Sequence, residues 1–166
     1  LEPARAGRPW LRVLRHPAAA GQSAAVRSGV LAARATIVAP LGGDGQTDPA
    51  FIPALLEALE QAGDGTGLAQ GQRRGRKDGR FKMIQSRIAN GVRGRILKDS
   101  TRDTGCGLKL FRRHVYLRLP YFDALHRFMP ALVARDGYTV AHRDAIDRPR
   151  PIGTPHSGPL VRPRVG

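Results

Sequence analysis

The chain has 166 residues, with 28 lysines and arginines against 13 aspartates and glutamates, a formal net charge of +15. Its single cysteine, Cys106, excludes an internal disulfide, and no apolar run reaches the roughly 18 residues of a membrane span or shows a signal peptide. We therefore expect one domain in a reducing compartment such as the cytoplasm, attracted to polyanions. Aromatic residues are only 5% of the chain and do not alternate with the basic ones, which argues against nucleic acid as a partner.

The first part of the chain alternates predicted strands and helices. Residues 11–14 alternate apolar and basic side chains, as a half-buried strand does. Residues 21–35 place small apolar side chains on one helical face, residues 36–39 form a short apolar strand, and Pro49 suits the first turn of a helix. This order predicts a mostly parallel sheet covered by helices.

The second part of the chain continues with weaker signals. A glycine-rich break leads into a weak strand at 68–69 and a basic segment. Beyond it the patterns predict an amphipathic helix over 81–96, a strand over 108–111, one or two helical turns over 112–120, a helix over 121–137 kinked at Pro130, and a late strand over 138–141. We expect a domain over 1–148 and a basic tail rich in proline and glycine over 149–166.

The segment LGGDGQTDPA, residues 41–50, places oxygen-bearing side chains in a glycine-rich loop after a strand. Asp44 and Gln46 offer the hard oxygen ligands that Mg²⁺ or Mn²⁺ prefers, and ligands bind beyond the carboxyl ends of strands in open α/β sheets. A plain turn before a helix is the alternative interpretation, and spacing alone leaves both open. Asp48 directly precedes Pro49, so we assign it to the helix cap.

Two further clusters carry charge or hydroxyl groups. Lys82 and Ser86 are four residues apart and share a helical face, which would suit a phosphate clamp, although a solvated basic face explains them equally well. The segment TRDTGCGLK holds Asp103 and Thr104 before a strand. Cys106 in this segment has no base beside it in the sequence, which favours a small buried side chain over a nucleophile.

Several motifs together resemble one family. The segments GQSAAVRSGVLAAR, GDGQTDPAFIPALLEAL, GQRRGRKD, SRIAN, TRDTGCGLKLFRR, LPYFDALHRFMPAL and DRPR, in this order, are similar to the family 2 glycosyltransferases related to dolichol-phosphate mannosyltransferase. The resemblance covers roughly residues 11–158. It implies a GT-A-like (Rossmann-like) α/β fold that uses Mg²⁺ or Mn²⁺ to transfer a sugar from a nucleotide donor to a polyprenyl phosphate.

The resemblance also implies roles for individual residues. Asp44 matches the second aspartate and Gln46 the amide of the family's Asp-Gly-Asp-Gly-Gln segment, both near the metal. Asp44, Arg73 and Ser86 are the expected catalytic residues. The expected substrate-binding residues are Lys82, Arg87, Asp103, Thr104, Arg148 and Arg150.

The same resemblance implies a mechanism and partners. An acceptor phosphate is already anionic near neutral pH, so it can attack the anomeric carbon without a protein general base. The donor would be GDP-mannose or a UDP-sugar, and the acceptor a dolichyl or undecaprenyl phosphate. We expect the protein to be peripheral at the inner membrane face, where anionic lipids attract its basic surface.

The sequence departs from the family pattern at three places. Gly42 stands where relatives have the first aspartate of the loop, and Asp147 stands where they have a histidine. The sequence also begins near the family's third strand, so we expect a sheet without the first strands. These departures leave an alternative function open, a catalytically degenerate basic module that binds anionic membrane or nucleic acid.

Overall fold

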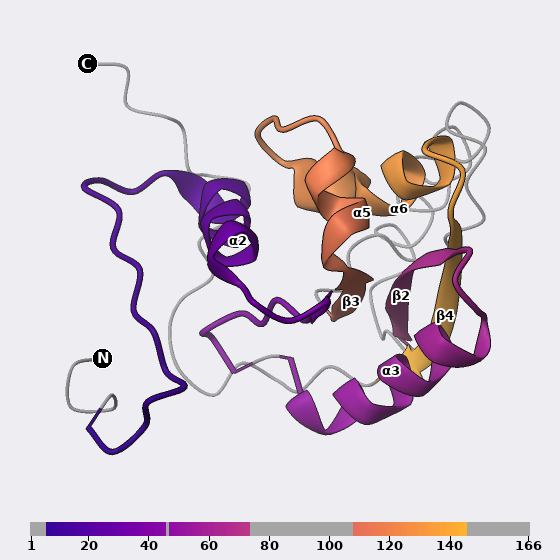
Figure 1. Cartoon of the computed structure of the whole chain (residues 1–166), viewed down its shortest axis with the longest axis horizontal. Coiled ribbons are helices and arrows are strands. Elements are labelled where there is room, and N and C mark those ends of the chain that lie inside the picture. The colour runs from indigo at the N-terminus through magenta and orange to yellow at the C-terminus, as the bar shows by residue number, and fades with distance from the viewer. Residues whose placement is uncertain (1–5, 46, 74–107, 146–166) are drawn as a thin grey trace, which may run out of the picture.

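The computed structural model describes residues 6–45, 47–73 and 108–145, and in these ranges a four-stranded sheet lies between two layers of helices (Figure 1). The chain leads from an extended segment into its first helix, and after the sheet's first strand into a loop that carries Asp44. The elements in chain order are α2 (Gly21–Ala32), β1 (Ile37–Val38), the 3₁₀ helix η1 (Pro49–Phe51), α3 (Ile52–Gln61), β2 (Thr66–Arg73), β3 (Lys109–Arg112), α5 (Arg113–Arg118), α6 (Leu125–Arg135) and β4 (Thr139–Ala145).

The sheet is mixed, with the strand order β1-β3-β2-β4. β3 is antiparallel to both of its neighbours, β1 and β2, whereas β2 and β4 are parallel. Strands β1, β2 and β4 therefore run in one direction and β3 runs against them. The predicted mostly parallel sheet is right in the direction of three strands, but the βαβα order did not reveal that β3 is reversed. β3 runs against β2 because the chain enters β3 beside the end of β2, where the Gly71 amide donates to the Leu108 carbonyl at 3.0 Å.

Helix α3 covers one face of the sheet. Its hydrophobic residues recur at helical spacing, and Leu55, Ala58 and Leu59 are buried. In a strand, every second side chain points to the same face of the sheet, and the helix packs against the strand side chains on that face. This cluster contains Leu55, Leu59, Ala69, Leu108 and Leu110.

Helices α2, α5 and α6 cover the other face (Figure 1). Phe111 of β3 and Tyr116 of α5 stack with ring centroids 4.9 Å apart in the middle of this layer. Burial raises the pKa of the Tyr116 hydroxyl, while the charge of Arg27 acts in the opposite direction. The buried members of the cluster are Val30, Leu68, Phe111, Val115, Tyr116, Leu119, Leu125, Met129 and Val133.

Most predicted elements within the described ranges are confirmed, with shifted ends. The helix predicted over 121–137 occupies Leu125–Arg135 and contains Pro130, and the strand predicted at 68–69 extends over Thr66–Arg73. The helix predicted over 81–96 and the tail over 149–166 lie outside the described residues.

The strand predicted over residues 11–14 is wrong. This segment belongs to no sheet and instead lies against α2, where Arg12 donates to the carbonyl of Ala32 and His16 bonds to Ser28. Alternating apolar and basic residues indicate a segment with one side in solvent and one side buried. Such a segment forms a strand only where a neighbouring strand offers backbone hydrogen-bond partners.

Candidate functional site

The carboxyl ends of β1, β2 and β4 lie at one edge of the sheet, because these three strands run in the same direction. Val38 of β1 and Leu68 of β2 are both opposite Phe111 of the strand between them. The two strands are therefore about 10 Å apart, twice the usual spacing of neighbouring strands. β1 ends level with Leu68, five residues before Arg73, and the loop after it leaves the sheet toward the edge at which β2 and β4 end, which we call the carboxyl edge.

The described ends of the chain on either side of residues 74–107 also meet at the carboxyl edge. β2 ends there at Arg73, and Leu108 bonds to Gly71 two residues before that end. Arg73 itself is opposite Ala145, the last residue of β4. Arg73 is the last residue described before the gap, so its role at a strand end stays a prediction.

The remaining candidate residues belong to segments whose described neighbours are at this edge. Lys82, Ser86, Arg87, Asp103 and Thr104 fall between Arg73 and Leu108, and Arg148 and Arg150 follow Ala145 by a few residues. They lie outside the described residues, as does Gln46, so their roles remain predictions. The topology brings both ends of the first segment, and the start of the second, to the edge where Asp44 lies.

Asp44 lies in the loop between β1 and η1 and is half-buried. Its carboxylate turns back toward Gly42, where a Cβ would lie 3.0 Å from the Asp44 Oδ1. Gly45 next to it has φ of +69°, a left-handed conformation that favours glycine. The loop thus brings positions 42 and 44 together, but only position 44 has a carboxylate.

Asp48 has a different role from Asp44. Its Oδ1 accepts a hydrogen bond from the Ala50 amide at 3.0 Å, and its backbone carbonyl accepts from the Phe51 amide at 3.3 Å. Pro49 follows at the first position of η1, where a missing amide proton costs nothing. The prediction that Asp48 caps this helix is confirmed.

The chemistry of the loop fits a metal ion that is held mainly by its substrate. Within the described ranges no three His, Cys, Asp or Glu side chains gather closely enough to hold a metal by themselves. Mg²⁺, however, commonly binds through one or two carboxylates and completes its coordination with water and substrate phosphates. Asp44 supplies one such carboxylate at the carboxyl edge.

A row of polar side chains near this edge was not predicted from the sequence. Gln70 of β2 is opposite Lys109 of β3 on one side and His142 of β4 on the other. Gln70 is fully buried and Lys109 is only 5% exposed. Since side chains two residues apart share a face, Gln70 and Lys109 lie on the face of Leu68 and Phe111, toward α2, α5 and α6.

A serine and a histidine join two helices above the same face. Ser23 of α2 is buried, and its hydroxyl lies 2.9 Å from the Nδ1 of His126 on α6. Burial lowers the pKa of His126, and the positive charges of Arg127 and Lys109 lower it further. These effects disfavour the protonated form of the histidine. The sequence signal for the pair of Ser23 and His126 was a single polar residue on the apolar face of each helix. One polar residue does not change the apolar pattern that predicts a helix, so the pair was missed.

Comparison with known proteins identifies the family. The family described as Glycosyl transferase family 2 matches residues 1–119, which is most of the chain. The chain belongs to this family. It is also 38% identical over 115 residues to a dodecaprenyl-phosphate galacturonate synthase of Rhizobium johnstonii, a match that covers 69% of this chain and 33% of that protein.

Solved structures share the fold of this chain. Glucosyl-3-phosphoglycerate synthase from Mycobacterium tuberculosis, in complex with Mn²⁺, uridine diphosphate and phosphoglyceric acid, matches with a TM-score of 0.59 at 20% identity. The complex of that enzyme with Mg²⁺ and uridine diphosphate gives 0.58, also at 20% identity. These matches cover 89% of this chain and 51% and 52% of the respective neighbours. The predicted GT-A-like fold is confirmed.

The chain spans a third of the length of the curated relative and about half of that of the solved structures. Among the helices that the structure describes, none combines the length and apolar composition needed to cross a bilayer.

Proposed function

We propose that the protein transfers a sugar from a nucleotide sugar to a polyprenyl phosphate. The observation that carries this proposal is topological: β1, β2 and β4 run in one direction in a family 2 glycosyltransferase chain, so the Asp44 loop and the segments after Arg73 and Ala145 all leave the sheet toward its carboxyl edge. Ligands of open α/β sheets bind beyond such an edge. The name of the curated relative supports a polyprenyl phosphate as the acceptor.

The donor diphosphate would be held at the loop after β1. Asp44, together with Gln46, would hold Mg²⁺ or Mn²⁺, which neutralises charge on the diphosphate as the leaving group departs. Structures of the fold neighbours, which contain Mn²⁺ or Mg²⁺ with uridine diphosphate, support a divalent metal and a uridine nucleotide.

The acceptor phosphate would be held by basic residues at the same edge. Arg73 ends β2 there, and Lys82, Ser86, Arg87, Arg148 and Arg150 would contribute further charge and a hydroxyl. Asp103 and Thr104 would line the acceptor side. The two substrates both carry negatively charged phosphates, which repel each other. The positive side chains of such a site would offset this repulsion and so hold the substrates together.

The chemical step needs no protein base. An oxygen of the acceptor phosphate attacks the anomeric carbon, a new carbon–oxygen bond forms, and the bond to the donor's β-phosphate breaks. The bonding electrons leave with the nucleoside diphosphate, so charge moves from acceptor to leaving group. A protein of this function works at the inner face of the membrane, where its lipid acceptor is found, as a peripheral protein on the cytoplasmic side.

A transfer assay tests the proposal. Labelled UDP-sugars and GDP-mannose are each incubated with a short polyprenyl phosphate, with Mn²⁺ or with a chelator, and lipid-linked label is counted. We expect metal-dependent transfer from one donor, and about a hundredfold loss in Asp44→Asn. Asp48→Asn is the matched control, because it removes a carboxylate from the same loop while asparagine still caps the helix.

The active relative named above serves as a positive control in this assay. If that relative turns over and this chain does not with any donor, the transferase function is wrong for the 166 residues studied. Equal activity of Asp44→Asn and the wild type would instead contradict the role of the loop.

A further inference from the structure

The segment that leads into α2, and α2 itself, carry only positive charge. Between residues 6 and 43 the sequence contains no aspartate or glutamate, and its charged residues are Arg8, Arg12, Arg15, Arg27 and Arg34. We call residues 6–34, which comprise the extended segment 6–20, α2 and the two residues after it, the N-terminal layer. Acidic residues resume only at Asp44, in the loop of the candidate site.

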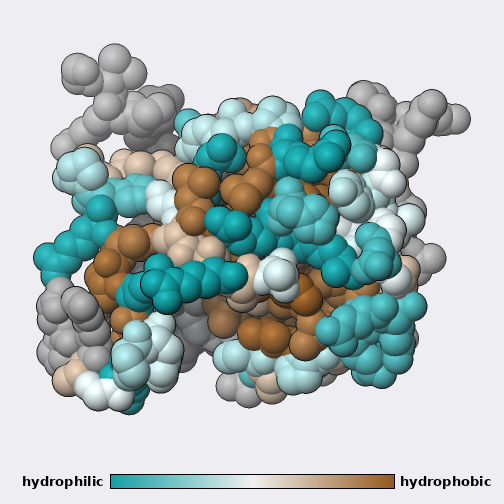
Figure 2. Space-filling model, in the orientation of Figure 1, coloured by the Kyte–Doolittle hydropathy of each residue, from teal (hydrophilic) through white to brown (hydrophobic). Residues whose placement is uncertain are grey.

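The N-terminal layer also exposes large apolar side chains. Trp10 is 74% exposed, Leu14 52% and Leu31 55%, the three highest values among the large hydrophobic residues described. Figure 2 shows an apolar area beside strongly hydrophilic side chains on the side where Figure 1 places the extended segment. Apolar and cationic groups therefore share one surface.

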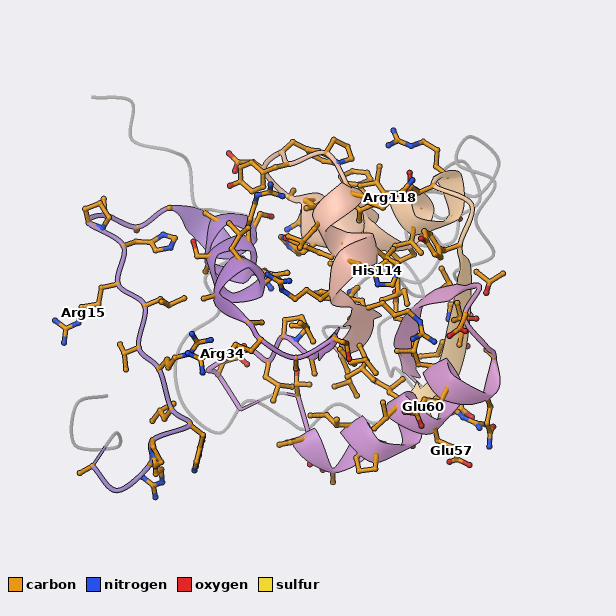
Figure 3. The ribbon with its side chains drawn as sticks, viewed as in Figure 1. Arg15, Arg34, Glu57, Glu60, His114 and Arg118 are labelled. Atoms are coloured by element: carbon orange, nitrogen blue, oxygen red, sulfur yellow. The ribbon has the colours of Figure 1, made fainter. Side chains whose placement is uncertain are left out.

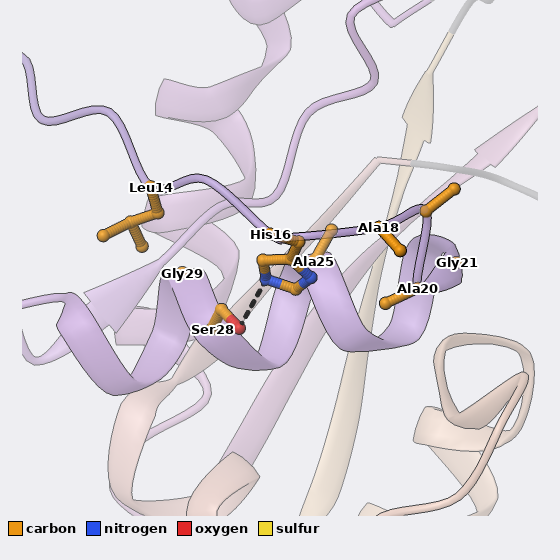
Figure 4. Close-up of a pocket in the computed structure, with 9 residues that line it drawn as sticks. Leu14, His16, Ala18, Ala20, Gly21, Ala25, Ser28 and Gly29 are labelled. Atoms are coloured by element: carbon orange, nitrogen blue, oxygen red, sulfur yellow. Dashed lines mark hydrogen bonds between the residues drawn. The ribbon is translucent and has the colours of Figure 1, made fainter.

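Specific contacts hold the extended segment on α2. Arg12 donates to the Ala32 carbonyl at the end of the helix, and the His16 Nε2 lies 2.9 Å from the Ser28 hydroxyl in its middle (Figure 4). The segment thus runs antiparallel to the helix before the chain turns into it. An open groove of about 390 Å³ lies between them, and its lining is mainly small and apolar: Leu14, His16, Ala18, Ala19, Ala20, Gly21, Ala25, Ser28 and Gly29.

The opposite end of the molecule carries acidic groups. In Figure 3, Arg15 and Arg34 lie toward the side of the extended segment, whereas Glu57 and Glu60 of α3 lie at the far end of the view. This separation gives the described part of the chain a positive, partly apolar side and a more acidic side. A charged surface would be approached with the positive side first.

We propose that the N-terminal layer docks on the surface of a lipid bilayer that contains anionic headgroups. Trp10 would enter the interface between headgroups and acyl chains, where the amphipathic indole is favoured, with Leu14 beside it. The exposed arginines Arg8, Arg15 and Arg34 would meet the headgroups, each cation near such a surface contributing about 1 kcal/mol, whereas Arg27 lies over the ring of Tyr121. The proposed function gives the protein a reason to be at a membrane, and the docking proposal rests on it in this respect alone. The docking proposal adds the surface that makes the contact.

A second copy of the chain fits this surface less well. A symmetric contact places the same patch on both partners, so the arginines of two N-terminal layers would face each other with no acidic side chain from residues 6–43 between them. Like charges across an interface oppose binding. Charge complementarity therefore favours an anionic surface over self-association.

Fluorescence tests the proposal directly, because Trp10 is the one tryptophan in the chain. Vesicles of phosphatidylcholine, with or without phosphatidylglycerol, are titrated into the protein without sugar donor or polyprenyl phosphate. We expect a blue shift of the emission and quenching by brominated lipid with anionic vesicles only. Because no substrate is present, failure of docking and failure of catalysis are separate results.

Matched variants locate the contact. Arg34→Gln should weaken binding to anionic vesicles about fivefold, whereas Arg135→Gln, which removes the same charge from the exposed end of α6, should leave it nearly unchanged. Leu14→Ala should weaken binding more than Phe128→Ala, an exposed apolar residue of α6.

Three results would overturn the proposal. One is an unchanged Trp10 emission with anionic vesicles, and another is equal weakening by Arg34→Gln and Arg135→Gln. The third is a blue shift that grows with protein concentration in the absence of vesicles, together with a dimer in sedimentation velocity, which would assign the surface to a second copy.

Discussion

The two faces of the sheet differ in what they bury. Under α3 the buried cluster is entirely aliphatic, and its members come from α3, β2, β3 and Leu108 directly before β3. On the other face, buried apolar residues share the space with Ser23, Gln70 and Lys109 near the carboxyl edge. One face serves packing alone, whereas the other combines packing with polar groups beside the candidate site.

This difference has an energetic meaning. Buried aliphatic side chains stabilise the fold without a desolvation penalty, whereas a buried polar group that lacks a hydrogen-bond partner destabilises it. Titratable groups whose pKa is shifted by burial and by neighbouring charges are concentrated at functional sites. The comparison therefore predicts that changes under α3 affect stability alone, while changes near the carboxyl edge affect ligand binding or its pH dependence.

The largest effect is expected from Leu59→Ala on the α3 face. Leu59 is fully buried in the aliphatic cluster, so truncation should lower the free energy of unfolding by about 3 kcal/mol. Urea unfolding measures this value. Leu31→Ala, at an exposed position of α2, is the control and should change stability by less than about 0.5 kcal/mol. Comparable losses in both variants would contradict the packing role assigned to this face.

A glycine pair tests the packing of the other face. A Cβ at Gly67 would lie 3.0 Å from side-chain atoms of Tyr138, Val115 and Val133, so Gly67→Ala should cost about 2 kcal/mol through overpacking. Gly65→Ala is the matched control, since nothing lies within 4 Å of its Cβ position. Thermal unfolding of both variants checks the prediction, and equal melting temperatures would show that this face yields to added volume.

Restoring a carboxylate at Gly42 should strengthen metal binding at the carboxyl edge. A side chain at position 42 starts 3.0 Å from the Asp44 Oδ1, so Gly42→Asp places two carboxylates together after a shift of a few tenths of an ångström. We expect about tenfold tighter Mn²⁺ binding, or about 1.4 kcal/mol, by calorimetry. Unchanged affinity would mean that Asp44 is not part of a cation site. Gly43→Asp, where the Cβ position is open, serves as the control.

The smallest effect concerns pH. The pKa of His126 is lowered by burial and by the charges of Arg127 and Lys109, so the folded state binds this proton less readily than the unfolded state. The contribution to stability is then complete above the unfolded pKa of about 6.5 and declines as the pH falls toward the folded value. Unfolding at pH 5 and pH 7.5 should show a smaller pH dependence in His126→Gln than in His16→Gln. Identical pH dependence in the two variants would contradict this role.

The sequence predicted local features well and long-range pairing poorly. Helix α3 was predictable because Pro49, the Asp48 cap and the apolar spacing all act within a few residues. The direction of β3, and the absence of a strand at residues 11–14, depend on which strands become neighbours in the sheet. Local sequence patterns do not contain that information.

The candidate site divides in the same way. The loop that carries Asp44 was predicted to follow a strand and does follow β1, because the short apolar run at residues 36–39 marks that strand, whereas the roles of Asp44 and Arg73 stay predictions. The row of Gln70, Lys109 and His142 was missed because each residue is a single polar group in a separate strand. Only the register of the sheet brings them together.

The most direct test of the central claim is a thermal shift with Mn²⁺ and uridine diphosphate together. Saturating ligand should raise the melting temperature of the wild type and of Asp48→Asn by about 5 °C, since binding to the folded state alone stabilises it. Asp44→Asn should lose this rise while unfolding at the same temperature as Asp48→Asn without ligand. An equal rise in both variants would contradict the claim that Asp44 gathers a cation and a diphosphate at the carboxyl edge.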